Sequence, residues 1–315
     1  MSKVEQRRSK VSPQTTDTVL MIRPAVFGVN VQTAASNEYQ EAPTSAGADL
    51  CARAVAEFDA VVAALRSGGV RVLVMDDTPD PPKPDAVFPN NWITTHEDGS
   101  VVFYPMEALN RRIERRGDVV PFLEAAGFQV NRVVDYSVWE GRGAYLEGTG
   151  SMVLDRPGRR CYAAISSRTH ETLLGRFCSD FGYEPVTFHA MGRRGPIYHT
   201  NVMLAIGAGV AVVGLDTVPD AGERENLRRH LESGGRTVIC MTNDQVHDFA
   251  CNVLELCGRD GPVLVLSRRA LDVLDDQQRR LLAAAATLLP VSIPTLECGG
   301  GSVRCTLAEV FLPPA

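Results

Sequence analysis

The segment Gly299-Gly300-Gly301-Ser302-Val303-Arg304-Cys305 contains the last of five distinctive residues that recur along the chain. Counting back from Cys305, a polar residue interrupts a mostly apolar stretch at intervals of 53, 51, 54 and 56 residues. Strands at such intervals are ordinary in an α/β protein, but a polar residue at the same point of each strand is not. The spacing therefore predicts five similar structural modules. In chain order, the four earlier residues are Asn91, Glu147, Asn201 and Asn252.

A helix, a glycine and a short strand recur with nearly the same period. Four amphipathic segments end at Gly69, Gly127, Gly182 and Gly235, which are 58, 55 and 53 residues apart. Glycine readily adopts the left-handed conformation that ends a helix. The predicted helices cover residues 49–67, 118–126, 170–181, 223–233 and 269–288. The predicted strands after them cover residues 70–75, 129–134, 184–188, 236–240 and 290–293.

Each module is completed by a pair of extended segments before its helix. Four pairs are continuous in the chain, and the fifth is divided between its two ends. The segment 302–311 lacks a following helix, and the segment 19–24 lacks a preceding site strand. The four continuous pairs are 87–95 with 101–104, 145–154 with 160–165, 198–206 with 210–215, and 250–256 with 263–266.

Joining the two ends predicts an α/β fold, a closed five-module α/β-propeller of pseudo-five-fold ββαβ repeats. In this fold the last strand docks beside the first, which removes exposed sheet edges. Residues 19–315 would form one domain, with the five distinctive residues around a common axial pocket. Residues 1–18 are polar, and we expect them to form a flexible N-terminal tail.

The composition excludes several classes of protein. The chain has 315 residues, of which 44% are hydrophobic and 22% charged, values typical of a globular protein with a large core. Its net charge of −6 argues against a broad nucleic-acid-binding surface. The uncharged runs 195–215 and 281–296 are interrupted by glycine or proline, so neither predicts a membrane span. Without an apolar leader in residues 1–18, we expect a cytoplasmic protein.

Cysteine chemistry is expected at one position. The chain has eight cysteines and no CxxC motif, so structural zinc is not expected, and most of the thiols should be reduced and buried. A cysteine after three glycines can receive backbone amide donors, which suits a nucleophile. A buried packing cysteine is the ordinary alternative, but the repeat position of Cys305 favours the nucleophile. Cys298 precedes the glycines and falls outside the repeat.

Two further residues have catalytic chemistry. His199 stands two positions before Asn201, so the two side chains would point to the same face of a strand. A histidine beside a thiol is a candidate acid and base. Considered without its neighbours, His199 would be expected almost equally often to have a purely structural role. Glu147 is a carboxylate on an otherwise apolar strand, where it requires a cation or planar hydrogen-bond donors.

These segments resemble the guanidine-modifying, or pentein, superfamily over nearly the whole chain. The superfamily includes arginine deiminases, dimethylarginine dimethylaminohydrolases, agmatine deiminases and amidinotransferases. Its members share a Glu-Gly-Gly-Asp/Asn-like strand, a His-x-Asp strand and a glycine-rich segment before a C-terminal cysteine. The resemblance is strongest to citrulline-utilisation hydrolases and arginine-deiminase-related proteins, which share Phe88-Pro89-Asn90-Asn91-Trp92. The other matching segments are Leu146-Glu147-Gly148-Thr149-Gly150, His199-Thr200-Asn201 and Gly301-Ser302-Val303-Arg304-Cys305.

The resemblance also implies a binding site for the amino-acid end of a substrate. Ser166-Ser167-Arg168-Thr169 is similar to a deiminase motif whose arginine binds the substrate α-carboxylate. The run Asn110–Glu114 is similar to a basic segment of the same family, so Arg111 or Arg112 would assist Arg168.

Two departures from the family pattern bear on the substrate. Asn91 and Asn201 stand where many guanidine-processing members have aspartate. Glu147 would then be the main acidic contact, with Asp85 as a second. Several carboxylates suit a cationic guanidinium, whereas a neutral ureido group needs the donors and acceptors that asparagine supplies. The departures therefore favour a citrulline-like substrate over arginine.

The resemblance implies a hydrolase that cleaves a C–N bond of a guanidino or ureido amino acid. Cys305 would attack the planar carbon, Glu147 would hold the nitrogen donors, and His199 would protonate the departing nitrogen and then activate water. Asn91 and Asn201 would complete the cradle. No metal or organic cofactor is expected, and the expected partner is the small-molecule substrate rather than nucleic acid or a membrane.

Three alternatives stay open at this point. An amidinotransferase would use an amine in place of water, and an arginine deiminase or dimethylargininase proper would differ only in its substrate. A non-catalytic ring-shaped binding protein would have no use for both Cys305 and His199. The residues leave the oligomeric state open, a homodimer included.

Overall fold

The strands form five small sheets that repeat one pattern. The computed structural model describes residues 13–42 and 47–315, and within them each sheet has three strands. The middle strand pairs antiparallel with one neighbour and parallel with the other in every sheet. The sheets are β15 (Ala308–Glu309), β1 (Thr18–Arg23) and β2 (Arg71–Asp76); β3 (Ile93–Thr95), β4 (Ser100–Phe103) and β5 (Arg132–Asp135); β6 (Val153–Asp155), β7 (Arg160–Ala164) and β8 (Glu184–Phe188); β9 (Leu204–Ile206), β10 (Val210–Val213) and β11 (Thr237–Cys240); β12 (Leu254–Gly258), β13 (Gly261–Ser267) and β14 (Thr287–Val291).

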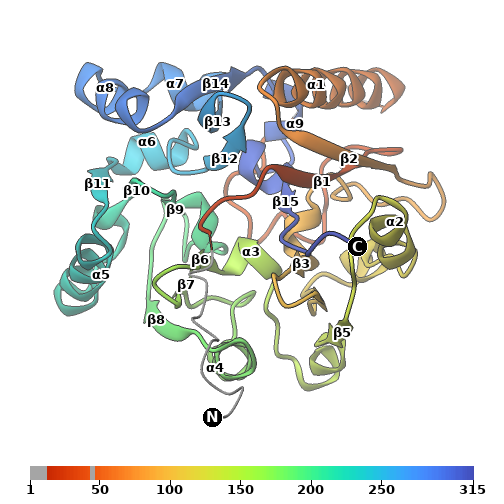
Figure 1. Ribbon diagram of the computed structural model, residues 1–315, viewed down its shortest axis with the longest axis horizontal. Helices are drawn as coiled ribbons and strands as arrows, with labels where there is room; N and C mark the ends of the chain where they lie inside the picture. Colours follow the sequence, from red (N-terminus) through yellow and green to blue (C-terminus); the bar gives the residue numbers. More distant parts are fainter. Residues whose placement is uncertain (1–12, 43–46) are drawn as a thin grey trace, which may run out of the picture.

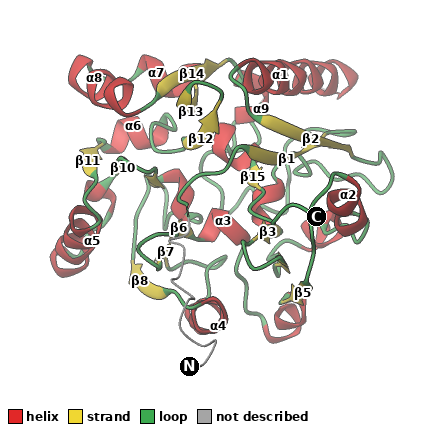
Figure 2. Ribbon diagram, in the orientation of Figure 1, coloured by secondary structure: helices red, strands yellow, loops and turns green. Residues whose placement is uncertain are grey.

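A helix connects the two parallel strands of each sheet. Figures 1 and 2 show these helices at the periphery, while α3, β6 and β15 lie nearer the middle. The connecting helices are α1 (Gly47–Ser67), α2 (Val119–Ala125), α4 (Glu171–Phe181), α5 (Ala221–Ser233) and α8 (Asp276–Ala285). Shorter helices are α3 (Gly148–Ser151), α6 (Asn243–His247), α7 (Arg268–Asp272) and α9 (Pro294–Glu297), and the 3-10 helices are η1 (Pro89–Asn91), η2 (Leu109–Glu114), η3 (Ser137–Arg142), η4 (Thr200–Val202), η5 (Leu215–Thr217) and η6 (Val303–Thr306).

The predicted modules are confirmed at the level of these sheets, because each module contributes strands and a helix in the expected order. The single helix predicted over residues 269–288 is wrong. Ser267 caps α7 and Asp275 caps α8, each by accepting a hydrogen bond from a backbone N–H of the first turn. The chain is already extended from Thr287, where β14 begins beside β13.

The predicted site strands are also partly wrong. In the first of them, residues 87–95, the strand begins only at Ile93, and Asn91 lies in the 3-10 turn η1 before it. Asn201 and Cys305 lie in the corresponding turns η4 and η6, and Glu147 is the N-cap of α3. His199 is the N-cap of η4, so it and Asn201 do not share a strand face. The five distinctive residues therefore stand where the chain turns, immediately before a short inner strand.

The two ends of the described chain meet in one sheet. Val19 pairs with Glu309 and Leu20 with Ala308, which confirms the predicted docking of the last strand beside the first. The residues just before β1 are also hydrogen-bonded, since Gln14 donates to the carbonyl groups of Leu154 and Ile206. Residues 1–12 of the expected tail lie outside the described residues.

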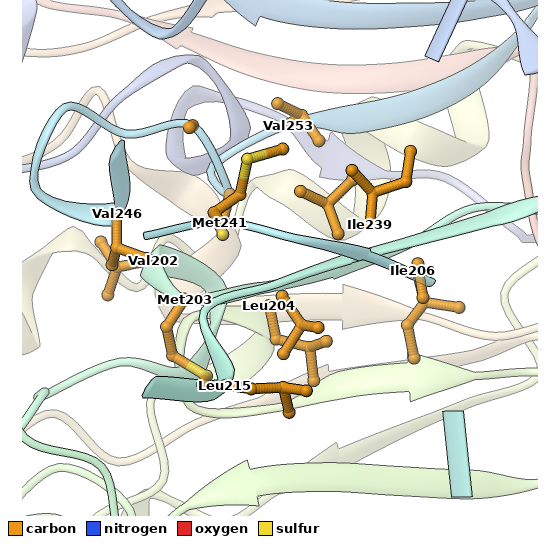
Figure 3. Close-up of a cluster of buried hydrophobic side chains, with 14 of the residues drawn as sticks. Val202, Met203, Leu204, Ile206, Leu215, Ile239, Met241, Val246 and Val253 are labelled. Atoms are coloured by element: carbon orange, nitrogen blue, oxygen red, sulfur yellow. The ribbon is translucent and has the colours of Figure 1, made fainter. Parts of the chain in front are cut away.

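The apolar core is divided among the modules. Four clusters of buried apolar residues pack between helices and sheets. Figure 3 shows part of the first, where Ile239 and Met241 lie on one side of the fourth sheet and Met203 and Leu204 lie on the other. No helix of the described part of the chain is long and apolar enough to cross a membrane. The interior between the clusters contains many buried polar side chains, and these form the site.

The cysteines only partly follow the expectation that all but one are packing residues. Cys161, Cys178 and Cys251 are buried free thiols, as is Cys305. Cys240 and Cys257 are exposed, so they do not serve as core residues. Cys240 is the last residue of β11, and Cys257 is the next-to-last residue of β12.

Candidate active site

A small pocket collects residues from distant parts of the chain. Cys305 and His199 line it together with Arg111 and Arg168. The glycine loop 299–301 forms one wall, where Gly301 packs against the ring of Phe88. The remaining lining residues are Asn37, Asp85, Asn91 and Tyr198. Most of the residues that the sequence singled out are therefore brought together.

Glu147 and His199 form a buried pair beside this pocket. The His199 Nε2 and Glu147 Oε2 atoms are 2.8 Å apart, and the exposed fractions of the two residues are 2% and 0%. Burial acts to raise the pKa of Glu147, but the charge of Arg168 and the hydrogen bond from His199 outweigh it and lower that pKa to about 2. Burial lowers the pKa of His199 to about 4 against the opposing effect of Glu147. The pair thus consists of a carboxylate and a neutral imidazole at neutral pH.

Two arginines compensate the buried charge of Glu147. Arg168 Nη1 lies 3.6 Å and Arg111 Nη1 3.9 Å from Glu147 Oε2. Arg111 also forms a two-point ion pair with Glu114, at 2.9 and 2.8 Å. The other carboxylate oxygen of Glu147 accepts the backbone N–H of Glu107 at 3.0 Å. A buried carboxylate is stable only with such partners, so this network holds Glu147 ionised.

Cys305 receives hydrogen bonds from two amide side chains. Asn201 Nδ2 and Asn252 Nδ2 are each 3.4 Å from the sulfur, which belongs to a residue only 4% exposed. The thiol is positioned by the turn η6, in which the N–H of Cys305 donates to the carbonyl of Ser302.

Asn91 and Asp85 lie on the side of the pocket where Arg111 is. Asn91 Oδ1 accepts from Arg111 Nη1 at 2.9 Å, and Asp85 Oδ2 is 3.4 Å from Arg111 Nε. Burial raises the pKa of Asp85 even though Arg111 opposes this shift. The second carboxylate oxygen of Asp85 and the side-chain oxygen of Asn201 are buried acceptors that have no partner within residues 13–42 and 47–315. Unpaired buried acceptors favour a ligand that brings N–H groups.

Arg112 is not brought into the pocket, unlike its neighbour. Its guanidinium donates to the carbonyl oxygens of Met106 and Glu107 and lies 3.4 Å from Glu140. The 3-10 helix η2 points adjacent side chains in different directions, so Arg111 faces the pocket and Arg112 faces away. Of the two arginines that the resemblance offered, only Arg111 lies at the site.

Several site residues were missed by the sequence reasoning. Asn252 had the repeat position that would have identified it, but it was not selected as a site residue. Ser36 and Asn37 come from an irregular segment without a periodic signal. Ser36 Oγ accepts from Arg168 Nη2 at 2.7 Å, and Asn37 Nδ2 donates to the carbonyl oxygens of Gly299 and Gly300. This segment therefore fixes both Arg168 and the glycine loop.

Two glycines allow the turn after Glu147 to approach the site closely. Gly148 has a φ of +49°, and a side chain there would meet the carbonyl oxygen of Asn90 at 2.3 Å. A side chain at Gly150 would meet Asn91 Nδ2 at 2.6 Å and His199 Nδ1 at 2.7 Å. Within residues 13–42 and 47–315, no group of three or more His, Cys, Asp or Glu side chains is arranged to hold a metal ion.

The fold and site together define a member of the guanidine-modifying superfamily, as the sequence predicted. Within it, the chain belongs to the family described as N,N dimethylarginine dimethylhydrolase, eukaryotic, whose model matches residues 23–312. It is therefore a hydrolase that acts on C–N bonds of guanidino compounds. No curated protein matches the chain in sequence.

Solved structures share the fold at low sequence identity. The N-terminal domain of ArgZ, an arginine dihydrolase of the ornithine-ammonia cycle in cyanobacteria, gives a TM-score of 0.71 at 16% identity, over 93% of this chain and 97% of that one. Unliganded AgrE gives 0.74 at 17% identity, and the match spans 95% of this chain but 40% of AgrE. A dimethylarginine dimethylaminohydrolase adduct with 4-chloro-2-hydroxymethylpyridine gives 0.62 at 13% identity, over 94% and 99%.

Proposed function

We propose that this chain hydrolyses the guanidino group of a free arginine-like amino acid through a covalent Cys305 intermediate. The observation that carries the proposal is the meeting of Cys305 with the His199–Glu147 pair at one pocket. The family membership supplies the reaction class, and the pocket supplies a nucleophile, a neutral base and a fixed carboxylate. ArgZ, whose fold is similar, is an arginine dihydrolase.

The reaction proceeds in two halves. The Cys305 thiol passes its proton to His199 while its sulfur bonds to the planar guanidino carbon, and the C=N electron pair moves to nitrogen. His199 then gives the proton to the departing nitrogen, the C–N bond breaks, and an amidino-thioester-like adduct remains. In the second half His199 takes a proton from water as the water oxygen bonds to the carbon. The C–S bond then breaks while His199 returns that proton to the sulfur, and the remaining hydroxyl proton is released, which leaves a ureido product and the Cys305 thiol. A neutral His199, held by Glu147 Oε2, suits both proton transfers.

The amino-acid end of the substrate is assigned to Arg168. Its guanidinium lines the pocket, lies over the Tyr198 ring and is fixed by Ser36. A fixed guanidinium binds a carboxylate in a two-point, planar manner. Glu147 and Asp85 then face the guanidino end, so the pocket complements a zwitterionic substrate.

The same pocket supports a ureido substrate as a second candidate. Asn201 Oδ1 is a buried neutral acceptor that has no partner in the described part of the chain, and the Asn91 amide lines the pocket. Such amides match the N–H and C=O groups of a ureido group without requiring a positive charge. Turnover of citrulline would then release ammonia and carbon dioxide and leave ornithine.

We propose further that the five modules close into a ring, with residues 19–315 as a single catalytic domain. Three contacts between the innermost strands support it: β15 lies beside β3, β6 beside β9, and β9 beside β12. The two remaining contacts between modules involve turns: α3 of the third module contacts β3 of the second, and η6 of the first module contacts β13 of the fifth. The site lies where these turns meet.

The decisive assay compares substrates that differ at one end. Purified protein is incubated with arginine, Nω-methylated arginines, citrulline and agmatine, while ammonia, methylamines, citrulline and ornithine are followed. We expect turnover of a guanidino amino acid, and a loss of at least a thousandfold in Cys305→Ala. Agmatine lacks the carboxylate, so it should react much more slowly than arginine in the wild type, and Arg168→Ala should narrow that difference.

Three outcomes would contradict parts of the proposal. Full activity in Cys305→Ala would exclude the covalent mechanism, and no turnover of any of these compounds would exclude the substrate class. An unchanged preference for arginine over agmatine in Arg168→Ala would remove Arg168 from the carboxylate site.

A further inference from the structure

The nucleophile's sulfur is contacted by amide groups from two different modules. Asn201 belongs to the turn η4 before β9, and Asn252 stands before β12. Each places its Nδ2 atom 3.4 Å from Cys305 Sγ. Asn252 has an exposed fraction of 0%, so its amide faces the sulfur without competing water.

The orientation of the Asn252 amide is determined by its other partners. Its Oδ1 accepts the backbone N–H of Arg304 at 3.1 Å, and its Nδ2 also donates to the carbonyl oxygen of Asn201 at 3.0 Å. Reversing the amide would lose both bonds, so the nitrogen must stay on the side of the sulfur. The Cys305 thiol also donates to this Oδ1 atom, but over a longer distance of 3.8 Å. The Asn252 side chain thus contacts Arg304, Cys305 and, in the neighbouring module, Asn201.

The two arginines of the pocket interact with groups other than the Cys305 sulfur. Arg111 is paired with Glu114 in a two-point contact, and Arg168 binds Ser36 and lies beside Glu147. The recorded side-chain donors to the sulfur are neutral amides. Hydrogen bonds to an anion stabilise it more than hydrogen bonds to a neutral group do, so these amides favour the thiolate over the thiol.

We propose that Asn252 is a positioning residue that stabilises the Cys305 thiolate and holds it toward the pocket. This inference rests on the proposed function in one respect, the use of Cys305 as the nucleophile. Asn252 does not touch substrate in this arrangement, and it acts only through the sulfur and the turn η6. Its loss should therefore change the reactivity of the thiol in a manner that depends on pH.

Alkylation of the thiol tests the inference without any substrate. Trypsin cleaves after Arg304, so Cys305 falls in a different peptide from Cys298, and mass spectrometry can follow its reaction with iodoacetamide alone. We expect Asn252→Ala to slow alkylation of Cys305 about threefold at pH 7. A roughly tenfold smaller thiolate fraction is partly offset because a more basic thiolate is also more nucleophilic. At pH 10 the difference should vanish or reverse.

An isosteric variant separates this effect from a loss of folding. Asn252→Asp keeps the oxygen that accepts from Arg304 but replaces the donor with an anion, and we expect about tenfold slower alkylation at pH 7. Asn131→Asp makes the same change at an amide that binds the Asp98 carbonyl, and its alkylation rate should equal that of the wild type. Thermal unfolding of each variant shows whether the fold is retained.

The pH dependence decides the result. A purely structural role would loosen the turn and change the alkylation rate by the same factor at pH 7 and pH 10, which would overturn the inference. Equal rates in Asn252→Asp and wild type at pH 7 would also overturn it. Full turnover in Cys305→Ala would instead refute the proposed function, whereas the alkylation result would still stand.

Discussion

At the scale of single residues, the most unusual feature is burial of titratable groups in several modules. His96 is 5% exposed, its Nε2 lies 3.0 Å from the Thr94 hydroxyl, and its ring stacks on Phe181. Burial, followed by the charge of Arg156, lowers the pKa of His96 to about 3. His199 shifts in the same direction, to about 4. Both histidines are therefore neutral in the folded protein at neutral pH.

These two histidines predict a loss of stability in mild acid. Unfolded histidine has a pKa near 6.5, above both folded values, so the unfolded chain binds more protons as the pH falls below about 6.5. Each histidine should lower the free energy of unfolding by up to about 1.4 kcal/mol per pH unit in this window. Glu147 adds to the loss only below its ordinary pKa of 4.5, because its folded value is about 2.

Urea unfolding at pH 7, 6 and 5 measures this effect. Relative to the wild type, we expect His96→Gln to reduce the decline in stability between pH 6.5 and 5 by up to about 1.4 kcal/mol per pH unit, since His96 no longer titrates. Glutamine keeps a hydrogen-bonding partner for Thr94. An identical decline in the variant and the wild type would show that His96 is already charged, or exposed, in the folded protein.

At the scale of elements, the turns before the inner strands control the site. Gly148 and Gly150 lie in α3, where the backbone packs against Asn90, Asn91 and His199. At Gly148 the neighbour is a backbone carbonyl and φ is positive, whereas at Gly150 the neighbours are side chains of the site. Substitution should therefore affect folding at the first position and catalysis at the second.

Three glycine-to-alanine variants distinguish the effect on folding from the effect on catalysis. We expect Gly148→Ala to lower the free energy of unfolding by about 2 kcal/mol or more, because the turn must move. Gly150→Ala should reduce turnover at least tenfold, since its methyl group displaces His199 or Asn91, with a smaller effect on stability. The control is Gly175→Ala in α4, where the new Cβ would have no described atom within 4 Å apart from its chain neighbours and the backbone of its own helix, and stability should rise by about 0.5–1 kcal/mol. Urea unfolding and turnover are measured for each, and full activity in Gly150→Ala would contradict the close packing of this turn.

The elements also show what sequence can predict and what it cannot. The recurring helices that end at glycine could be predicted because helical amphipathicity is a local property of the sequence. The strand β8 was predicted with its observed bounds. Asn91 and Cys305 were predicted to lie in strands, because 3-10 helices of three or four residues have no periodicity of their own. The difference between Arg111 and Arg112 likewise depends on the direction of η2, which two adjacent arginines cannot reveal. Ser36 reaches Arg168 across the fold, and no local pattern marks such a contact.

At the scale of the whole molecule, the pairing of β1 with β15 joins the two ends of the described chain. Val310, Phe311 and Leu312 are buried after β15, and the N–H of Val310 donates to the carbonyl of Thr18. Burying three such side chains stabilises the fold by about 5–8 kcal/mol. Because whole domains are stable by only about 5–15 kcal/mol, this short segment is a large part of the total.

Deletion of residues 308–315 should therefore abolish cooperative unfolding or lower the Tm by more than about 10 °C. Differential scanning calorimetry of the shortened protein measures this. The matched control removes only Pro314 and Ala315, which are exposed, and should change the Tm by no more than a few degrees. A Tm unchanged by the longer deletion would show that the fold does not depend on joining its ends.

The position of Cys305 in the chain has a consequence for biosynthesis. Glu147, His199 and both amides that contact the sulfur are translated before the nucleophile, and β1 emerges from the ribosome long before its partner β15. Such a distant pairing forms slowly, so the first sheet stays incomplete while the other modules can already collapse. A nascent chain would therefore contain Glu147, His199 and Arg168 before Cys305, the nucleophile of the proposed mechanism, is translated. Under the proposed mechanism, catalytic competence would be acquired only when η6 and β15 dock.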